Sequence, residues 1–372
     1  MTEKGLADVV AAQTAISDID GARGRLWYAG YDIHDLARYS TFEETVFLLH
    51  RGRLPNRQEL EDLTERLVAE RDLDRFLGEL MPTFGEVTSP MSMLRTGISA
   101  SSAYDPDGWD QSAEANERKA MRLVARFPTL IAAYHRLRTG EKPVDPNPQL
   151  PHAANFLWML SGEEPDEEAA RAFDICLVLH ADHTMNASTF TARVVASTLS
   201  DMHSAITAAI AALKGPLHGG ANEAVMKLLE EIGEVDRVEA AIRDRLGRKE
   251  KIPGFGHRVY KVEDPRATHL RRLSRELGDR AGDTRWYDLS ERIEKVVMDE
   301  RGLYPNVDFY AASVYRYLDI PTDLMTCVFA ASRVTGWTAH VREQLADNRL
   351  IRPESEYVGP RDQRYVPIEE RS

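Results

Sequence analysis

Apolar residues in this chain recur every three or four positions over long stretches, and alternation with a period of two is rare. The pattern is clearest in residues 41–50, 57–70, 116–138 and 167–200. Because an α-helix turns once in about 3.6 residues, this spacing places apolar side chains on one helical face. The sequence therefore predicts a mostly α-helical protein with very little β-structure.

One short stretch departs from this helical period. Residues 25–33, with the sequence RLWYAGYDI, are rich in aromatic side chains and contain a glycine. Such a composition favours extended backbone followed by a turn. We expect short strands in this part of the chain.

The length of the chain predicts two domains. It has 372 residues, 43% of them hydrophobic, and this exceeds the size at which single cores usually stop growing. Charge rises after Gly219, and apolar helical spacing returns at 322–335. We therefore predict a small domain at 220–319 and a discontinuous large domain made of 1–219 and 320–372.

Charge and cysteine content restrict the possible partners and compartment. The formal net charge is -13, with no long Lys/Arg block, which argues against general binding to nucleic acid or to an anionic membrane. The chain shows neither a secretory leader pattern nor about 20 consecutive apolar residues. Cys176 and Cys327 lie in apolar surroundings, which is typical of reduced thiols in the cytoplasm.

Three segments indicate an acid/base site. GPLHGGANE at 215–223 and KIPGFGHRVYKVEDPR at 251–266 each place a histidine beside glycines, which lets backbone N–H groups and an imidazole approach a ligand. NVDFY at 306–310 puts Asp308 between apolar neighbours, where burial raises the pKa of a carboxyl group.

His218 has a further rationale. It comes just before the helix expected at 223–232, and the positive end of that helix disfavours an imidazolium. A neutral histidine can donate a hydrogen bond to a developing enolate. The alternative is that His218 only caps the helix.

A metal pair is a second alternative. His180 and His183 are three positions apart with Asp182 between them, but His203 or His152 would have to be recruited by the fold as further ligands. We expect no metal, and a core or substrate-binding role for these histidines.

The run GFGHRVYK at 254–261, followed by DPR, resembles the signature of citrate synthases. The resemblance covers nearly the whole chain, including GYDIHDLA (30–37), LRTGIS (94–99), RFPTLIAAYHR (126–136), LHADHTMNAST (179–189) and SRVTGWTAHVRE (332–343). The length is similar to that of the shorter bacterial and archaeal branch, which is dimeric. One departure is Ser89, where relatives commonly carry a histidine before the proline.

The resemblance implies a citrate-synthase-like, mostly α-helical fold and an acyltransferase activity. Such an enzyme condenses acetyl-CoA with oxaloacetate and hydrolyses citryl-CoA to citrate and CoA, with no permanently bound cofactor. The resemblance makes Asp308 the base, His218 the hydrogen-bond donor to the thioester oxygen and His257 the donor to the oxaloacetate carbonyl. Positioned groups of this kind accelerate proton transfer by about 10²- to 10⁴-fold each.

Oxaloacetate is a small dianion, and a bidentate guanidinium suits each of its carboxylates. The resemblance implies binding by His183, Arg266, Arg333 and Arg352, with Arg352 reaching across from the second subunit of a homodimer. Binding would bridge both domains and close the cleft. Composition alone would assign each arginine to a solvated helix face.

For CoA, the resemblance implies that adenine packs on one segment and that Lys261 approaches a phosphate. The segment consists of Lys251, Ile252, Pro253, Gly254, Phe255 and Gly256. Arg248, Lys249 and Arg258 are weaker candidates, equally readable as exposed loop charges.

Two other functions remain open from the sequence. A 2-methylcitrate synthase would use propionyl-CoA on the same residues, and one methylene is worth only about 1–3 kcal/mol of discrimination. A non-catalytic helical interaction protein would keep the fold without the chemistry.

Overall fold

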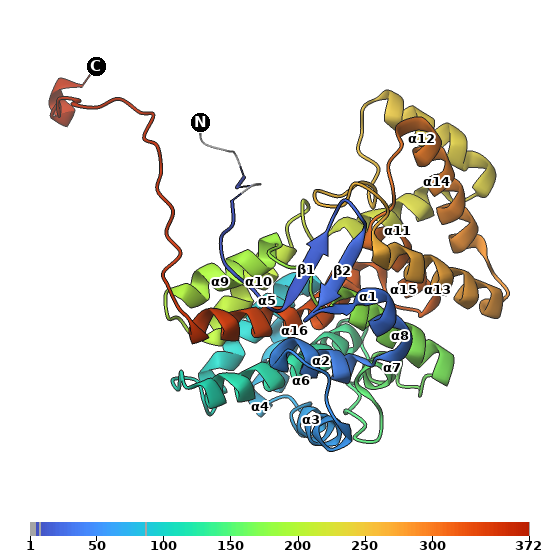
Figure 1. Ribbon diagram of the computed structural model, residues 1–372, viewed down its shortest axis with the longest axis horizontal. Coiled ribbons are helices and arrows are strands. Elements are labelled where there is room, and N and C mark those ends of the chain that lie inside the picture. The colour runs from blue at the N-terminus through green and yellow to red at the C-terminus, as the bar shows by residue number, and fades with distance from the viewer. Residues whose placement is uncertain (1–4, 7–8, 86–87, 372) are drawn as a thin grey trace.

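The computed structural model describes residues 5–6, 9–85 and 88–371. Over these residues the chain forms sixteen α-helices, a few short 3-10 turns and one three-stranded sheet. The prediction of a mostly α-helical fold with very little β-structure is confirmed (Figure 1). None of the described helices is long and apolar enough to cross a membrane.

The larger group of helices surrounds α16 (Met325–Ala346), which is buried on nearly all sides. Helix α16 packs against α2, α5, α6, α8, α9 and α10, as expected for a helix with apolar residues around its whole circumference. The group comprises α1 (Ile33–Tyr39), α2 (Phe42–Arg51), α3 (Arg57–Ala69), α4 (Arg75–Leu80), α5 (Pro90–Ser101), α6 (Ala113–Arg138), α7 (His152–Ser161), α8 (Glu167–His180), α9 (Ala187–Ser197) and α10 (Met202–Leu213), with 3-10 turns η1 (Met81–Thr83), η2 (Ser102–Tyr104) and η4 (Thr322–Leu324).

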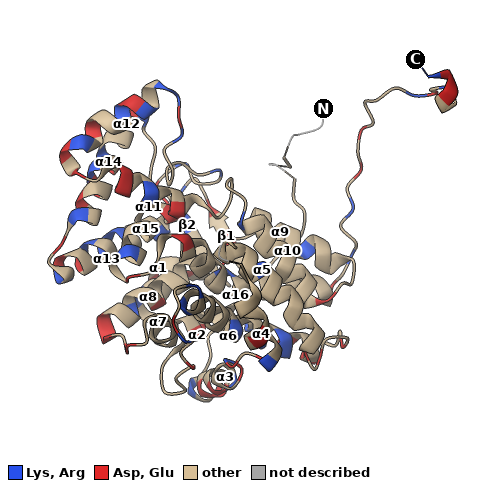
Figure 2. Ribbon diagram, turned by 180° about the vertical axis from the view of Figure 1, so that it is seen from behind, with Lys and Arg blue, Asp and Glu red and all other residues tan. Residues whose placement is uncertain are grey.

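A second group of helices lies at one end of the molecule (Figure 1). It comprises α11 (Ala221–Ile232), η3 (Val235–Arg237), α12 (Val238–Gly247), α13 (Pro265–Ala281), α14 (Arg285–Arg301) and α15 (Val307–Tyr317). These helices pack mainly on one another and touch the larger group through α1, α8, η4 and α16. Figure 2 shows basic and acidic residues interleaved along α12 to α14, as expected for helices with solvated faces. The domain boundaries at 220 and 319 stay a prediction.

The sheet consists of β1 (Ser17–Asp20), β2 (Arg25–Tyr28) and β3 (Tyr31–Asp32), paired antiparallel in that order. The short strands and the Gly-containing turn predicted within 25–33 are confirmed by β2, β3 and the turn between them. The chain turns at Gly30, which has φ 87°, and Ile33 already begins α1. Asp32 caps that helix by accepting a hydrogen bond from the His34 backbone N–H.

The helical stretch predicted at 167–200 is also interrupted. Helix α8 ends at His180 and α9 begins at Ala187. Between them Thr184 adopts φ 48°, which no α-helix accommodates, and Asn186 caps α9 by accepting from the Ser188 and Thr189 backbone N–H groups. The interruption carries His183.

Ser89 begins α5 as its N-cap and accepts a hydrogen bond from the Ser92 backbone N–H at 3.3 Å. The departure from the family pattern at this position is thus a regular helix cap. At the other end of the chain, residues 347–371 follow α16 as an exposed arm that leads away from the helices and ends in η5 (Ile368–Glu370) (Figure 1).

Candidate active site

An open cleft of about 2040 Å³ lies between the two groups of helices. Residues of α9 and of α11 to α16 line it, together with the loops that precede α9, α11, α13 and α15. The cleft brings together almost all of the predicted site residues: His183, His218, Lys251, Ile252, Pro253, Gly254, Phe255, Gly256, His257, Lys261, Arg266, Asp308 and Arg333.

The structure does not bring every candidate to this cleft. Arg352 lies on the exposed arm and is not among the lining residues. Of the three weaker CoA candidates, Lys249 and Arg258 line the cleft, whereas Arg248 is paired with Asp244 and Glu250 instead.

His218 is held by a helix other than the one that the sequence indicated. Its Nε2 accepts a hydrogen bond from the Ser188 backbone N–H at 3.2 Å, in the first turn of α9, and lies 2.8 Å from the Ser188 hydroxyl. Because Nε2 is an acceptor, the ring hydrogen of the neutral imidazole sits on Nδ1. Burial, with Arg333 nearby, lowers the pKa of His218 to about 4. The histidine is therefore a neutral donor at physiological pH.

His257 is fixed in the opposite tautomer. Its Nδ1 accepts from the backbone N–H groups of Val259 at 3.0 Å and Tyr260 at 3.2 Å, so the ring hydrogen sits on Nε2. Burial and the charge of Arg266 lower the pKa of His257 to about 4. Two neutral histidines thus face one cleft, each with one ring nitrogen anchored to backbone.

Asp308 lies in the first turn of α15 and is 9% exposed. Its Oδ1 has no hydrogen-bond partner among the described residues. Burial raises the pKa of Asp308 to about 7 and outweighs the opposing charges of Arg266 and Arg333. The burial of Asp308 and its raised pKa support the prediction that burial raises the basicity of this carboxylate.

A short bridge between two loops joins His257 to Asp308. The Gly256 backbone N–H donates to the Tyr304 oxygen at 2.9 Å, and the Asn306 backbone N–H donates to the Gly254 oxygen at 2.9 Å. Gly254 has φ 78°, and an added Cβ would lie 2.9 Å from the Cβ of Phe309. Glycine is needed here both for the backbone conformation and for close approach.

Two buried arginines supply positive charge. The Nε of Arg333 donates to the backbone oxygen of His180 at 2.6 Å, and the guanidinium lies over the Phe329 ring at 4.6 Å. Burial, with the charge of Arg266, lowers the pKa of Arg333 to about 10, so it remains charged at neutral pH. Arg266 forms a bidentate pair with Asp264, at 2.9 and 2.7 Å.

His183 completes the basic side of the cleft. It is 7% exposed, and its Nε2 lies 3.3 Å from the Tyr260 hydroxyl. The rings of His183 and His257 have centroids 5.1 Å apart. Burial and the charge of Arg266 hold the pKa of His183 well below its ordinary value, so this ring is neutral as well.

The sequence did not identify the groups that support these side chains. Ser188 holds His218 and itself accepts a hydrogen bond from the Trp337 indole at 3.0 Å. The Oδ1 of Asn186 lies 2.8 Å from the Ser188 hydroxyl. The Asn-Ala-Ser-Thr pattern is a helix-start signal that could have located the start of α9, but its contact with His218 depends on the fold. Lys227, Arg245 and Arg301 also line the cleft, and the sequence did not single them out.

The metal alternative is not supported. In the described parts of the chain, no group of three His, Cys, Asp or Glu side chains is placed to hold a metal ion. His180 donates from Nδ1 to the Cys176 oxygen at 2.7 Å. His203 lies elsewhere, with its Nε2 3.5 Å from the Asp105 carboxylate.

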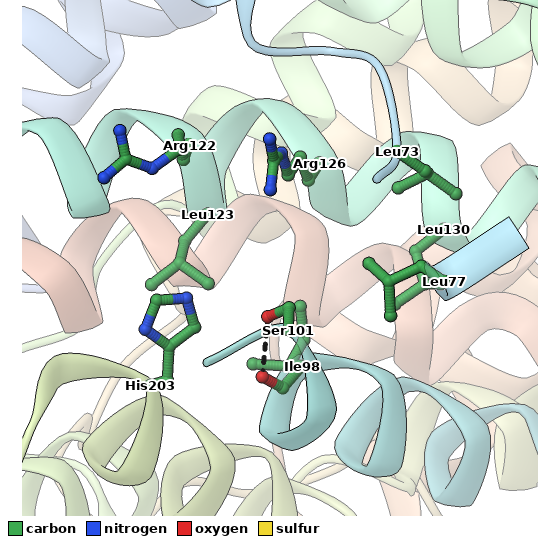
Figure 3. A pocket seen from close by; sticks show the side chains of 9 residues that line it. All are labelled: Leu73, Leu77, Ile98, Ser101, Arg122, Leu123, Arg126, Leu130 and His203. Carbon is green, nitrogen blue, oxygen red and sulfur yellow. Dashed lines mark hydrogen bonds between the residues drawn. The ribbon is translucent and has the colours of Figure 1, made fainter. Parts of the chain in front are cut away.

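His203 instead lines a small cavity of about 10 Å³ among α4, α5, α6 and α10 (Figure 3). Most of its other lining residues are aliphatic, and a space of this size holds about one water molecule. It contains none of the predicted catalytic residues, so the large cleft is the candidate active site.

Comparison with known proteins gives one consistent result. Residues 5–354 match the family model for the citrate synthase C-terminal domain. "Citrate synthase 2" of Bacillus subtilis is 52% identical over 99% of this chain and 99% of its own length. "Citrate/2-methylcitrate synthase" of the same species is 45% identical over 96% of this chain and 97% of its own length. The solved structure of citrate synthase from Thermoplasma acidophilum, a ternary complex with carboxymethyl coenzyme A and oxaloacetate, has a TM-score of 0.95 and 34% identity, with all of both chains covered.

Proposed function

Because this chain belongs to the citrate synthase family, we propose that it condenses acetyl-CoA with oxaloacetate and hydrolyses the resulting citryl-CoA to citrate and CoA. The observation that carries the proposal is the pairing of donors and acceptor in one cleft. His218 and His257 are neutral N–H donors, and Asp308 has a carboxylate oxygen with no partner in the part of the chain that the structure describes.

The first step is removal of a proton from the acetyl methyl group. Asp308 takes the proton, and its pKa of about 7 makes it a stronger base than an ordinary carboxylate. The Nδ1–H of His218 donates a hydrogen bond to the thioester oxygen as the enolate forms. With a pKa of about 4, His218 is neutral and donates this bond as imidazole, as a neutral histidine does in another enolising enzyme.

The second step forms the carbon–carbon bond. The enolate carbon attacks the ketone carbon of oxaloacetate while the Nε2–H of His257 donates a hydrogen bond to the ketone oxygen. The resulting alkoxide takes up one proton and becomes the hydroxyl of citryl-CoA, and Asp308 gives up the one proton that it had removed, so the step is balanced. Water then cleaves the carbon–sulfur bond and releases citrate and CoA.

Binding is assigned to the remaining cleft residues. Arg266, Arg333 and His183 bind the oxaloacetate carboxylates, which matches the dianion with buried positive charge. The segment 251–256 receives adenine, and Lys261 approaches a phosphate. The cleft lies between the small domain at 220–319 and the large one, so closure on oxaloacetate would exclude water before condensation.

The proposal is tested by the release of free CoA with oxaloacetate present. Acetyl-CoA and propionyl-CoA are compared as kcat/KM on one preparation, with Asp308→Asn as the control. Preference for acetyl-CoA, lost in the control, is the expected result. Preference for propionyl-CoA would instead make the protein a 2-methylcitrate synthase, and no release with either would leave the non-catalytic alternative.

We also propose that the active form is a homodimer in which Arg352 reaches the partner's cleft. The position of Arg352 on an exposed arm, away from its own cleft, supports this assignment. Cys176 and Cys327 are buried, unpaired thiols. Reduced thiols of this kind are typical of cytoplasmic proteins and support a cytoplasmic location.

Mixing two inactive variants tests the shared site. A dimer of Asp308→Asn with Arg352→Ala contains one cleft that has both the intact base and the intact arginine. If Arg352 acts across the interface, random mixing restores roughly a quarter of wild-type activity. If Arg352 acts within its own chain, no activity returns.

A further inference from the structure

A buried carboxylate and histidine lie behind His183, and the steps above do not use them. Asp182 and His340 are both 0% exposed, and the Nε2 of His340 lies 3.3 Å from the Oδ1 of Asp182. Burying a carboxylate is costly unless it is well paired. We therefore expect this buried pair to stabilise part of the fold or of the site.

The tautomer of His340 follows from its second contact. Arg193 on α9 donates from its guanidinium to the Nδ1 of His340 at 3.0 Å. Because a guanidinium has donors only, Nδ1 is an acceptor and the ring hydrogen sits on Nε2, directed at Asp182. Arg193 is itself held by Glu343 at 2.5 Å and by Gln344 at 3.1 Å. His340 is thus fixed at both ring nitrogens.

Asp182 in turn holds the backbone that carries His183. Its Oδ2 accepts from the Thr184 backbone N–H at 3.1 Å and from the Ser17 hydroxyl of β1. Thr184 has φ 48°, a conformation that a β-branched residue adopts only when its surroundings enforce it. The Asp182 carboxylate stabilises this conformation, because Asp182 precedes His183 and its side chain binds the backbone N–H of Thr184, which follows His183.

Helix α16 is in register with this segment. Gly336 donates from its backbone N–H to the Ala181 oxygen at 3.1 Å, and an added Cβ there would lie 2.3 Å from the Oδ1 of Asp182. Arg333, three positions earlier, and His340, four positions later, lie on the same helical face. One face of α16 therefore contacts residues 180, 181 and 182 in succession.

We propose that His340 is a positioning residue for His183: by donating to Asp182 it holds segment 181–184 in the conformation that turns His183 toward the oxaloacetate site. The inference rests on the proposed function, because oxaloacetate is the ligand that His183 would bind. It adds a residue that touches no substrate but determines how well the substrate is held.

Kinetics of three variants test the proposal. His340→Leu removes the donor, and His340→Gln retains an N–H donor at nearly the same reach. His152→Leu makes the same change at another buried histidine, outside the cleft. For His340→Leu we expect the KM for oxaloacetate to rise roughly tenfold or more with kcat changed much less, as for other residues that orient a binding group. His340→Gln should recover most of the affinity, and His152→Leu should leave KM unchanged.

A second measurement reads the segment without substrate. Hydrogen exchange at the Thr184 amide should quicken by about tenfold or more in His340→Leu, and should stay at the wild-type rate in His152→Leu. Exchange and KM both at wild-type values in His340→Leu would overturn the inference, as would a His340→Gln variant no better than His340→Leu. If the wild-type protein released no CoA, the proposed function would fail, and the exchange rates would still decide whether His340 holds this segment.

Discussion

The two sides of the cleft are built in different ways. One side, which we call the helix wall, consists of residues 180–188 backed by α16. It is held by side-chain contacts from β1, α9 and α16. The other side, the loop wall, consists of residues 253–258 joined to residues 304–308. It is held mainly by backbone hydrogen bonds between its own two loops and by glycines with positive φ.

The difference separates binding from chemistry. In the helix wall, Arg333 donates to the His180 oxygen, and Asp182 has distant partners in Ser17 and His340. In the loop wall, Asp308 keeps an oxygen without a partner among the described residues, which raises its free energy when ionised and makes it a better base. Charged groups with polar partners suit recognition of a charged substrate, whereas a buried carboxylate oxygen without a partner suits proton transfer. Variants in the two walls should therefore change different kinetic constants.

The largest expected effect comes from the loop wall. Asp308→Asn keeps the shape of the side chain but removes the base, so kcat should fall by about 10²- to 10⁴-fold. The dissociation constant for oxaloacetate, measured by calorimetry, should change little. A loss of affinity as large as the loss of kcat would contradict the separation between the two walls.

A substitution in the helix wall should change mainly the KM for oxaloacetate. In Gly336→Ala the new Cβ would meet Asp182 and the Ala181 oxygen, and overpacking of this kind costs about 1–3 kcal/mol of stability. The displaced segment should raise the KM for oxaloacetate more than it lowers kcat. The matched control is Gly247→Ala in α12, where an added Cβ meets nothing within 4 Å.

Gly247→Ala should keep wild-type kinetics and gain up to about 1 kcal/mol of stability from the higher helix propensity of alanine. An unchanged KM for oxaloacetate in Gly336→Ala, measured on folded protein, would show that α16 does not set the conformation of this wall.

The pH dependence of the reaction should report the loop wall alone. Asp308 must be ionised to accept a proton, and its pKa in the free enzyme is about 7. The value of kcat/KM should therefore fall about tenfold per pH unit below this pKa. His218 and His257, with pKa values of about 4, stay neutral between pH 5 and 7, so a second break in this range would contradict their assignment as neutral donors.

The smallest expected effect is on stability, and it has opposite signs in the two walls. His180 in the helix wall has a pKa of about 3 because it is buried, below the ordinary value of about 6.5. The contribution of neutral His180 to the free energy of unfolding is fully present above pH 6.5 and is lost as the pH falls toward 3. Asp308 has a pKa of about 7 in the folded protein and about 3.9 in the unfolded chain. The contribution of its protonated form to the free energy of unfolding is therefore fully present below about pH 3.9 and is lost as the pH rises through 7.

Thermal unfolding of Asp308→Asn separates these contributions. The variant should be more stable than the wild type at pH 8, by about 1–3 kcal/mol, and the difference should shrink toward pH 4. A difference that grows as the pH falls would mean that Asp308 is not held in an environment that disfavours its ionised form.

The candidate site was largely readable from local sequence. The helical period of residues such as those in α2, α3 and α6 is a property of a few consecutive turns, so these helices were predicted without knowledge of their packing. The histidines and the aspartate stand out because glycines or apolar residues flank them directly. The break between α8 and α9 was missed, because the apolar spacing continues on both sides of Thr184 and Asn186 while the hydrogen bonds that stop the helix come from Ser17 and Asp182.

What the sequence alone determined is therefore the helical class and the identity of the chemical groups, because both depend on neighbours along the chain. Only the tertiary structure decided which nitrogen of His218 and of His257 carries the hydrogen, how far burial raises the pKa of Asp308, and that Asp182 meets His340. Ser188 is 30 positions from His218, and Asp182 is 158 positions from His340. Hydrogen bonding and desolvation act through space, so groups far apart in sequence decide the protonation state and orientation of each side chain in the cleft.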